Sequence, residues 1–205
     1  MKEQFYVRNK FLYLYEMTSA VFGKEIERLV LSTGGDVFKK AYKRDLKKIS
    51  SSFNSFHQSF DLFIKLEDNE VIRIEVKSNR ASIKKAKSLS LADRAYKEED
   101  FKGEFHFQQL KPGFSHVFVL VGICSNAVLY YVLNSDELKS LSLSPQHKGS
   151  GTRDVNDDNF EGQVFITMKG LEKYRCDDEG LLSQMVLEKY NELNRETVLK
   201  IAKKF

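Results

Sequence analysis

The 205-residue chain has few of the residues that mark disulfide-rich, zinc-binding or membrane-spanning proteins. It contains two cysteines, Cys124 and Cys176, two prolines and no tryptophan. Two cysteines cannot build a disulfide framework, and no CxxC pair or Cys/His cluster at zinc spacing occurs. The longest apolar run, residues 117–124, is much shorter than the roughly 18 residues that a membrane helix needs. We therefore expect a soluble, cytoplasmic protein with no membrane association and no structural zinc.

Several catalytic motifs are also missing. No Walker glycine loop, GxGxxG or GxSxG sequence occurs, which argues against ATP use, dinucleotide binding and α/β-hydrolase chemistry. The four histidines form no pair at the i, i+4 spacing of helical metal ligands. A histidine-based nuclease is therefore not expected.

The composition is globular, with clustered positive charge. Hydrophobic residues make up 41% and charged residues 30%, which provides enough apolar side chains for a core and indicates a single domain over residues 1–205. The net charge of +4 is small, but basic residues gather in 39–48 and 77–87. Clustered lysines suit the phosphates of nucleic acid, and a solvated lysine-rich surface is the alternative.

The spacing of apolar residues changes along the chain from helical to strand-like and back. Helical spacing predicts a helix over residues 20–32 that ends at Gly34-Gly35, and a basic helix is expected over 38–49. Two strand-like runs, 60–66 and 71–77, predict a β-hairpin. Beyond it we expect partial helix over 88–110, strands at 115–124, 128–133 and 163–168, a short capped helix from Ser135, and helices within 177–205. This order indicates an α/β or α+β domain around one mixed sheet.

The second strand of the hairpin carries Arg73, Glu75 and Lys77 on one face, because side chains alternate along a strand. Pairing with the first strand can bring Asp61 near Glu75. Two neighbouring carboxylates repel each other, and a divalent cation relieves that repulsion. A lysine beside the cation can orient water or stabilise charge on a phosphate. These residues indicate a metal-dependent phosphodiesterase site; the alternative is a solvated Glu/Lys pair on an exposed strand.

Asp61 followed by Glu75-Val76-Lys77 resembles the PD-(D/E)XK nuclease superfamily, which includes type II restriction endonucleases, Holliday-junction resolvases and repair nucleases. The resemblance implies a restriction-endonuclease-like core, a central mixed sheet flanked by helices. It also implies Mg²⁺, with Mn²⁺ as a substitute, held by Asp61, Glu75 and the Val76 carbonyl, and it gives Lys77 the role of the motif lysine. Phe60 stands where the name of the motif has proline.

Two further matches extend the likeness to residues 20–135. Gly23 and Glu27 resemble the G-x-x-x-E of the first core helix, where the glutamate helps to hold the metal, with Glu25 as the fallback. An exposed helix glutamate is the alternative. Gln108 and Gln109, expected on a helix before the strand at 117–123, resemble glutamines that contact the active site or phosphate.

Two segments are candidates for contact with DNA. Lys84, Lys85 and Lys87 follow the catalytic strand and suit a phosphate-binding role. The polar stretch 144–161 is a candidate DNA-recognition loop, because its basic and amide side chains suit base edges. Its candidate DNA-binding residues are His147, Lys148, Arg153 and Asn156. A disordered solvent loop is the alternative.

The first hypothesis is a Mg²⁺-dependent type II restriction endonuclease that cuts double-stranded DNA and leaves 5′-phosphate ends. A palindromic target implies a homodimer, and a restriction enzyme implies a cognate DNA methyltransferase in the host. The aromatic N-terminal segment or the C-terminal helices are candidates for the dimer interface. A structure-specific resolvase or repair nuclease is the second hypothesis. A non-catalytic DNA-binding protein on the same fold is the third, and a globular protein with a coincidental E-x-K is the fourth.

Overall fold

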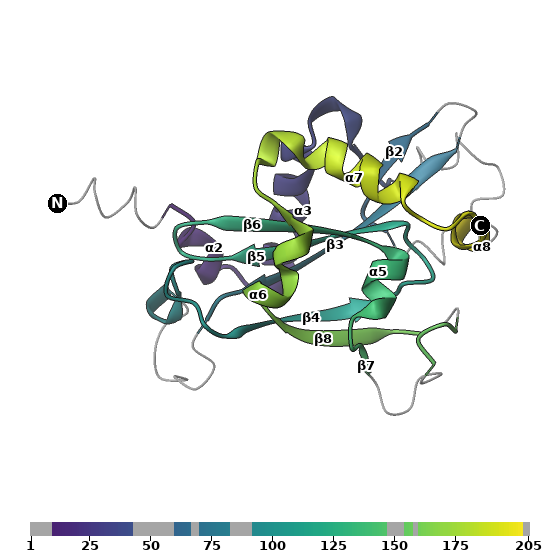
Figure 1. Ribbon diagram of the computed structural model, residues 1–205. Helices are drawn as coiled ribbons and strands as arrows, with labels where there is room; N and C mark the ends of the chain where they lie inside the picture. The colour runs from purple at the N-terminus through teal and green to yellow at the C-terminus, as the bar shows by residue number, and fades with distance from the viewer. Residues whose placement is uncertain are drawn as a thin grey trace.

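The computed structural model describes residues 10–42, 60–66, 70–82, 92–146, 154–157 and 160–202, which form a mixed α/β fold with two sheets (Figure 1). The larger sheet has the order β1 (Lys39–Lys40), β2 (Leu62–Lys65), β3 (Val71–Arg80), β5 (Val117–Ile123), β6 (Val128–Asn134) and β9 (Arg175–Cys176). The smaller sheet has the order β4 (Glu104–Leu110), β8 (Gly162–Thr167) and β7 (Ser144–Pro145). One mixed sheet was expected; a second sheet is the first difference from that expectation.

Helices accompany both sheets. The α-helices are α2 (Tyr13–Glu16), α3 (Ser19–Thr33), α5 (Ser135–Ser140), α6 (Met168–Leu171), α7 (Leu182–Asn191) and α8 (Arg195–Ala202). Short 3₁₀ turns are η1 (Gly35–Val37), η4 (Ala92–Arg94), η5 (Glu172–Tyr174) and η6 (Glu179–Leu181). The helix expected over 20–32 is confirmed as α3, which ends at Gly34. Helices within 177–205 are confirmed as α7 and α8.

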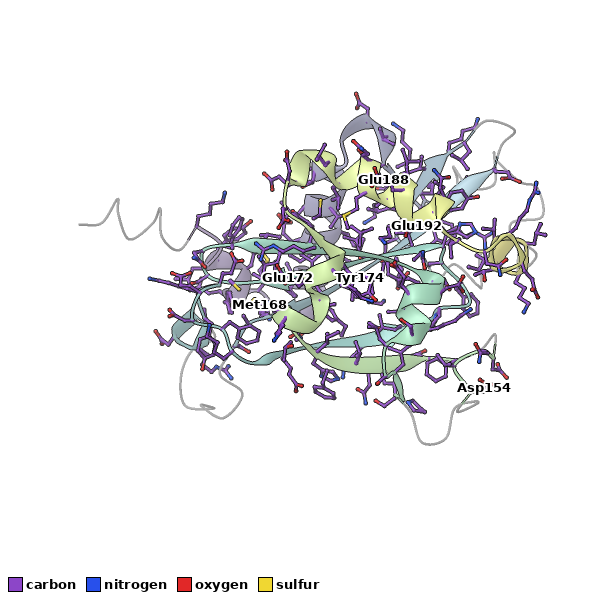
Figure 2. The ribbon with its side chains drawn as sticks, in the orientation of Figure 1. Asp154, Met168, Glu172, Tyr174, Glu188 and Glu192 are labelled. Atoms are coloured by element: carbon purple, nitrogen blue, oxygen red, sulfur yellow. The ribbon has the colours of Figure 1, made fainter. Side chains whose placement is uncertain are left out.

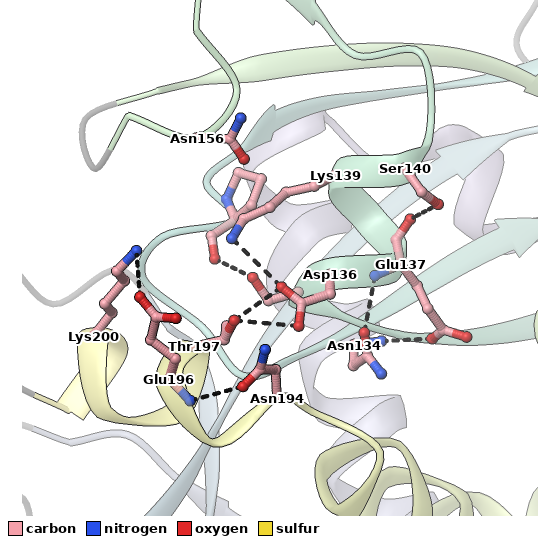
Figure 3. A network of polar contacts seen from close by, with 12 residues as sticks. Asn134, Asp136, Glu137, Lys139, Ser140, Asn156, Asn194, Glu196, Thr197 and Lys200 are labelled. Atoms are coloured by element: carbon pink, nitrogen blue, oxygen red, sulfur yellow. Dashed lines mark hydrogen bonds and ion pairs between the residues drawn. The ribbon is translucent and has the colours of Figure 1, made fainter.

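The central strands are confirmed, and their pairing makes the larger sheet mixed. The β2 and β3 strands pair antiparallel as the expected hairpin, and β5 and β6 pair antiparallel as well. The β3 and β5 strands pair in parallel. The short helix from Ser135 is confirmed as α5. Its N-cap is Asn134, whose side chain accepts from the Glu137 N–H while the Glu137 carboxylate accepts from the Asn134 N–H, a reciprocal capping box (Figure 3).

Two hydrophobic cores cover the two faces of the larger sheet. On one face Ile72, Ile74 and Val76 of β3 pack with residues of α3 and α7. On the other face Phe118 and Leu120 of β5 pack against the smaller sheet and the segment after it. Met168 and Tyr174, labelled in Figure 2, come from that segment and pack in this second core. Because β3 is covered on both sides, even its charged Arg73 and Glu75 are buried.

Two helix predictions were wrong. Lys39 and Lys40, expected in a basic helix over 38–49, form the edge strand β1, and the next residue, Ala41, continues the pairing by donating its N–H to the Asp61 carbonyl. Residues 43–49 of that expected helix lie outside the described residues. Within the segment 88–110, residues 104–110 form β4, because Phe105 and Phe107 alternate with His106 and point into the second core.

The C-terminal helix α8 packs over the hairpin strand β3. The buried Arg73 guanidinium donates to the carbonyl oxygen of Ile201, and burial lowers the pKa of Arg73 to about 10. On the other side of α8, the Thr197 hydroxyl donates to Asp136 of α5 over 3.0 Å, within the polar network of Figure 3. The helix α8 is therefore fastened both to β3, the strand that carries Glu75, and to α5.

Replacing Gly122 with alanine is expected to destabilise the fold and to disturb β4. A Cβ at Gly122 would lie 2.5 Å from Cζ of Phe105, so the two strands would have to separate. We expect an unfolding free energy lower by about 1–3 kcal/mol, measured by urea denaturation. Gly23→Ala is the matched control, since nothing lies within 4 Å of a Cβ there. Alanine in that helix should stabilise by about 0.5–1 kcal/mol. Equal stability of the Gly122→Ala variant and the native chain would contradict the close packing.

Candidate active site

Asp61 stands immediately before β2 and is fixed against β3. Its N–H donates to the Ile74 carbonyl over 3.0 Å, and its Oδ2 accepts from the Val76 N–H over 2.9 Å. The carboxylate thus takes the place of a backbone acceptor where the β2–β3 ladder ends at Leu62 and Ile74. This contact brings Asp61 beside the segment Glu75-Val76-Lys77, as the sequence indicated.

Glu75 and Lys77 lie on the same face of β3 and form an ion pair between Oε1 and Nζ. Glu75 is only 7% exposed, and its other oxygen, Oε2, is buried without a hydrogen-bond partner. A buried carboxylate oxygen without a partner is costly unless the group is protonated or a cation binds it. The alternative of a solvated surface pair is therefore wrong for Glu75.

The carboxyl groups have pKa values raised by their surroundings. Burial raises the pKa of Glu75 to about 8, and the negative charge of Asp61 adds to this. Burial also raises the pKa of Asp61, against the hydrogen bond from Val76, and the charge of Glu27 adds to the increase. Burial alone would lower the pKa of Lys77, but the paired Glu75 carboxylate outweighs it and raises that pKa. Two carboxyl groups that resist ionisation together form a site that attracts a cation.

Glu27 reaches the same place from α3. It forms an ion pair with Lys40 of β1, and both charges act on Asp61. Gly23, one turn earlier, lines the same cleft. Glu25, the fallback, instead pairs with Arg28 over 3.5 Å. The helix thus presents Glu27 to the Asp61 side of the site.

A cleft of about 580 Å³ joins Glu27, Asp61 and Lys77, and the buried Glu75 lies next to it through its ion pair with Lys77. Three elements form its walls: α3, which carries Glu27; the second half of β3, which carries Val76 and Lys77; and β4. Asp61 lies between α3 and β3. The His106 N–H of β4 donates to Asn79 Oδ1 of β3 over 3.2 Å, and this bond links β4 to β3. The cleft is open to a substrate at the point where the charged side chains converge.

Gln108 and Gln109 line the cleft from β4, a strand, so their expected place on a helix was wrong. The strand has a bulge between Phe107 and Leu110, and Gln109 has a φ of 56°, which residues other than glycine rarely adopt. The Gln109 N–H donates to the Gln146 side chain, which helps to hold this conformation. Such unusual backbone is often found at functional sites.

The donor set fits a hard divalent cation. Asp61 and Glu75 offer carboxylate oxygens, and Glu75 Oε2 is a buried acceptor with no partner. Over the described part of the chain, no three His, Cys, Asp or Glu side chains gather as a preformed metal site. The Val76 carbonyl and water molecules, which Mg²⁺ characteristically retains, would complete the coordination.

Of the other predicted DNA contacts, Asn156 alone lies among the residues that the structure describes. Lys84, Lys85, Lys87, His147, Lys148 and Arg153 lie outside the described residues. Asn156 lines a separate cavity of about 220 Å³ between α5 and α8, and its N–H donates to Asp154 Oδ1 over 2.9 Å. Figure 3 shows Asn156 near Lys139, at the edge of the polar network. The two cavities share no lining residue.

Several charged neighbours of the site were not expected from the sequence. Lys40 pairs with Glu27, and Lys111 pairs with Glu161 over 3.2 Å. The charge of Lys111 partly opposes the rise in the pKa of Glu75, and the charge of Glu161 adds to the rise in the pKa of Lys77. Nothing in local sequence marks these contacts, because each joins segments that are distant along the chain.

The chain has no match among protein-family models, curated proteins or solved structures. Over the part of the chain that the structure describes, every helix is too short or too polar to span a lipid bilayer. What the cleft can do chemically therefore follows from its own side chains.

Proposed function

We propose that this chain is a Mg²⁺-dependent DNA endonuclease with the active-site arrangement of the PD-(D/E)XK nucleases on a restriction-endonuclease-like core. One observation carries the proposal: Asp61 and Lys77 meet Glu27 of α3 at a single open cleft, the Asp61 carboxylate is bonded to the Val76 N–H, and the buried Glu75 is paired with Lys77 directly behind this cleft. Surface Glu/Lys pairs are common, but a buried carboxylate with an unpartnered oxygen beside a second carboxylate is rare.

Asp61, Glu75 and the Val76 carbonyl would hold the cation, with Glu27 assisting from the helix side. When bound, Mg²⁺ supplies positive charge against the phosphate and lowers the pKa of a bound water. Lys77, whose pKa is raised, remains an ammonium donor. It orients the attacking water and stabilises the negative charge that grows on the phosphate oxygens. In-line attack on phosphorus by water breaks the bond to the 3′ oxygen and leaves a 5′-phosphate and a 3′-hydroxyl.

Two kinds of nuclease, called here the first and the second form, fit this proposal. The first form is a type II restriction enzyme, which acts on double-stranded DNA as a homodimer beside a cognate methyltransferase. The second form is a structure-specific nuclease. The second form is favoured by an exposed aromatic pair that borders the cleft, His106 stacked on Phe165. A non-catalytic DNA-binding protein would need no cation to engage DNA.

The test is incubation of the purified chain with unmethylated plasmid, phage DNA and branched or tailed duplexes, in Mg²⁺ and in EDTA. Discrete bands that require Mg²⁺ would identify a sequence-specific enzyme. Cleavage limited to junctions or tails would identify the structure-specific form. Failure to cut any of these substrates in Mg²⁺ or Mn²⁺ would contradict the nuclease proposal.

A further inference from the structure

The smaller sheet has one buried face and one outer face. On the inner face Phe105, Phe107 and Val164 are buried in the second core. His106 and Phe165 are paired across β4 and β8 and point the other way, because side chains alternate along each strand. Phe165 is 48% exposed, which is unusual for a phenylalanine in a strand with a core available on its other side.

The outer face carries a preformed stack of two aromatic rings, which a further ring can extend. The rings of His106 and Phe165 stack with centroids 3.9 Å apart and planes 9° apart. His106 Nε2 lies 2.8 Å from Gln163 Oε1, and the Gln108 amide nitrogen lies 3.3 Å from the same His106 nitrogen. The Gln163 amide oxygen of β8 accepts from the His106 Nε2–H, which holds the imidazole in the plane that makes the stack and leaves the Gln108 NH₂ without a bond to that nitrogen.

This surface is continuous with the candidate active site. His106 and Gln108 line the cleft that contains Asp61 and Lys77. The backbone of His106 is bonded to Asn79, which lies on β3 two residues after Lys77. A nucleic-acid strand leaving the scissile position along β4 would reach His106 in the cleft wall and, beside it, Phe165 of β8.

We propose that the outer face of β4 and β8 binds an unpaired nucleobase of the substrate, which stacks on the Phe165–His106 pair while the Gln108 amide bonds its edge. Every base has an aromatic face that can stack on an aromatic side chain, but in a paired and stacked duplex that face is covered. The substrate class is therefore DNA with a single-stranded or extruded base next to the cut. This inference rests on the proposed nuclease function and names its substrate.

The experiment measures DNA binding by the full chain in EDTA, so that no strand is cut, using fluorescence anisotropy. Three probes are compared: a blunt duplex, the same duplex with a single-stranded extension, and that extension with abasic positions. Phe165→Ala is compared with Phe165→Trp, which keeps an aromatic face. Leu199→Ala is the matched control, because it removes an equally exposed apolar side chain from α8. Thermal unfolding of each variant checks that the fold is retained.

We expect the native chain to prefer the extended duplex. Phe165→Ala should weaken binding of that probe by about 10-fold, the loss that corresponds to one base–aromatic stack, and change binding of the abasic probe by less than about 2-fold. Phe165→Trp should restore the preference, and Leu199→Ala should not alter it. An equal effect of Phe165→Ala on the abasic and base-containing probes, or no preference of the native chain for the extension, would overturn the inference.

Failure of the nuclease proposal would look different. In that case the native chain would cut no DNA in Mg²⁺ or Mn²⁺, whatever the binding measurements show. Base-dependent binding without cleavage would support the base-binding surface and contradict the nuclease proposal. Cleavage without base-dependent binding would leave the nuclease and overturn the surface.

Discussion

Lys77→Ala is expected to lower Mg²⁺-dependent DNA cleavage by about 10³-fold while leaving the protein folded. Removing one preorganised donor that stabilises transition-state charge costs about 10²–10³-fold, and Lys77 also orients the attacking water. Its ammonium group is directed into the site by the ion pair with Glu75. DNA affinity should change much less than the cleavage rate, because one lysine supplies only one of the several phosphate contacts that a DNA-binding protein makes. The measurement is single-turnover cleavage of a labelled duplex with enzyme in excess.

Two variants make this result interpretable. Lys77→Met keeps most of the side-chain volume without the charge, and it should be as inactive as Lys77→Ala. Lys65→Ala removes an exposed lysine from the same hairpin, at the end paired with Val71, and should cut normally. Normal cleavage by Lys77→Met, or an unfolded Lys77→Met protein in place of an inactive folded one, would count against the role of Lys77.

Glu75→Gln is expected to abolish cleavage and, at the same time, to make the metal-free protein more stable at alkaline pH. Burial and the charge of Asp61 raise the pKa of Glu75 from 4.5 to about 8 in the folded state. Between these values the folded state holds a proton that the unfolded state has released, so the native chain loses stability as pH rises through this range. Glutamine carries no such titration. At about 1.36 kcal/mol per pKa unit, a rise of this size corresponds to a gain on the order of 5 kcal/mol at about pH 8 and above.

Denaturant unfolding over a pH series without divalent cations measures this effect. The native chain should become less stable between about pH 4.5 and 8 relative to Glu75→Gln, and the two should converge at acid pH. Glu70→Gln, an exposed position in the same hairpin, is the control and should follow the native curve. Parallel curves for the native and Glu75→Gln proteins across the whole pH range would show that the pKa of Glu75 is not raised in the folded protein.

Mg²⁺ adds a second comparison on the same two proteins. A cation that binds only the folded state raises the unfolding free energy as its concentration rises. Mg²⁺ should therefore raise the melting temperature of the native chain at pH 8, and it should do little for Glu75→Gln. An equal increase for both proteins would place the bound cation elsewhere.

The β2–β3 hairpin shows which features of the site can be predicted from the local sequence pattern. Alternation along β3 was sufficient to put Arg73, Glu75 and Lys77 on one face, and antiparallel pairing was sufficient to bring Asp61 beside them. Helical spacing likewise predicted α3, the helix on which Glu27 lies. These predictions succeeded because each depends on contacts within one element or between two elements joined by a short turn.

The predictions that failed depend on partners distant in the sequence. Gln108 and Gln109 were expected on a helix although the apolar residues before them are poorly spaced for one. In the structure Phe105 packs against Gly122, and β4 finds its partner strand in β8, far along the chain. Lys40 is in a strand because it adds to the edge of the hairpin at Leu62. Such pairing overrides local helix preference.

By itself, the sequence identified the residues proposed to carry the chemistry and predicted which face of a strand they occupy, since that face follows from the period of the backbone. Tertiary structure alone decided the environment of these residues. The second sheet and α8 cover β3, and this burial raises the pKa of Glu75 and leaves Glu75 Oε2 without a partner. The same packing joins His106 to Phe165 beside the cleft. Burial is a sum over many distant contacts, so it becomes visible only when the whole chain has folded.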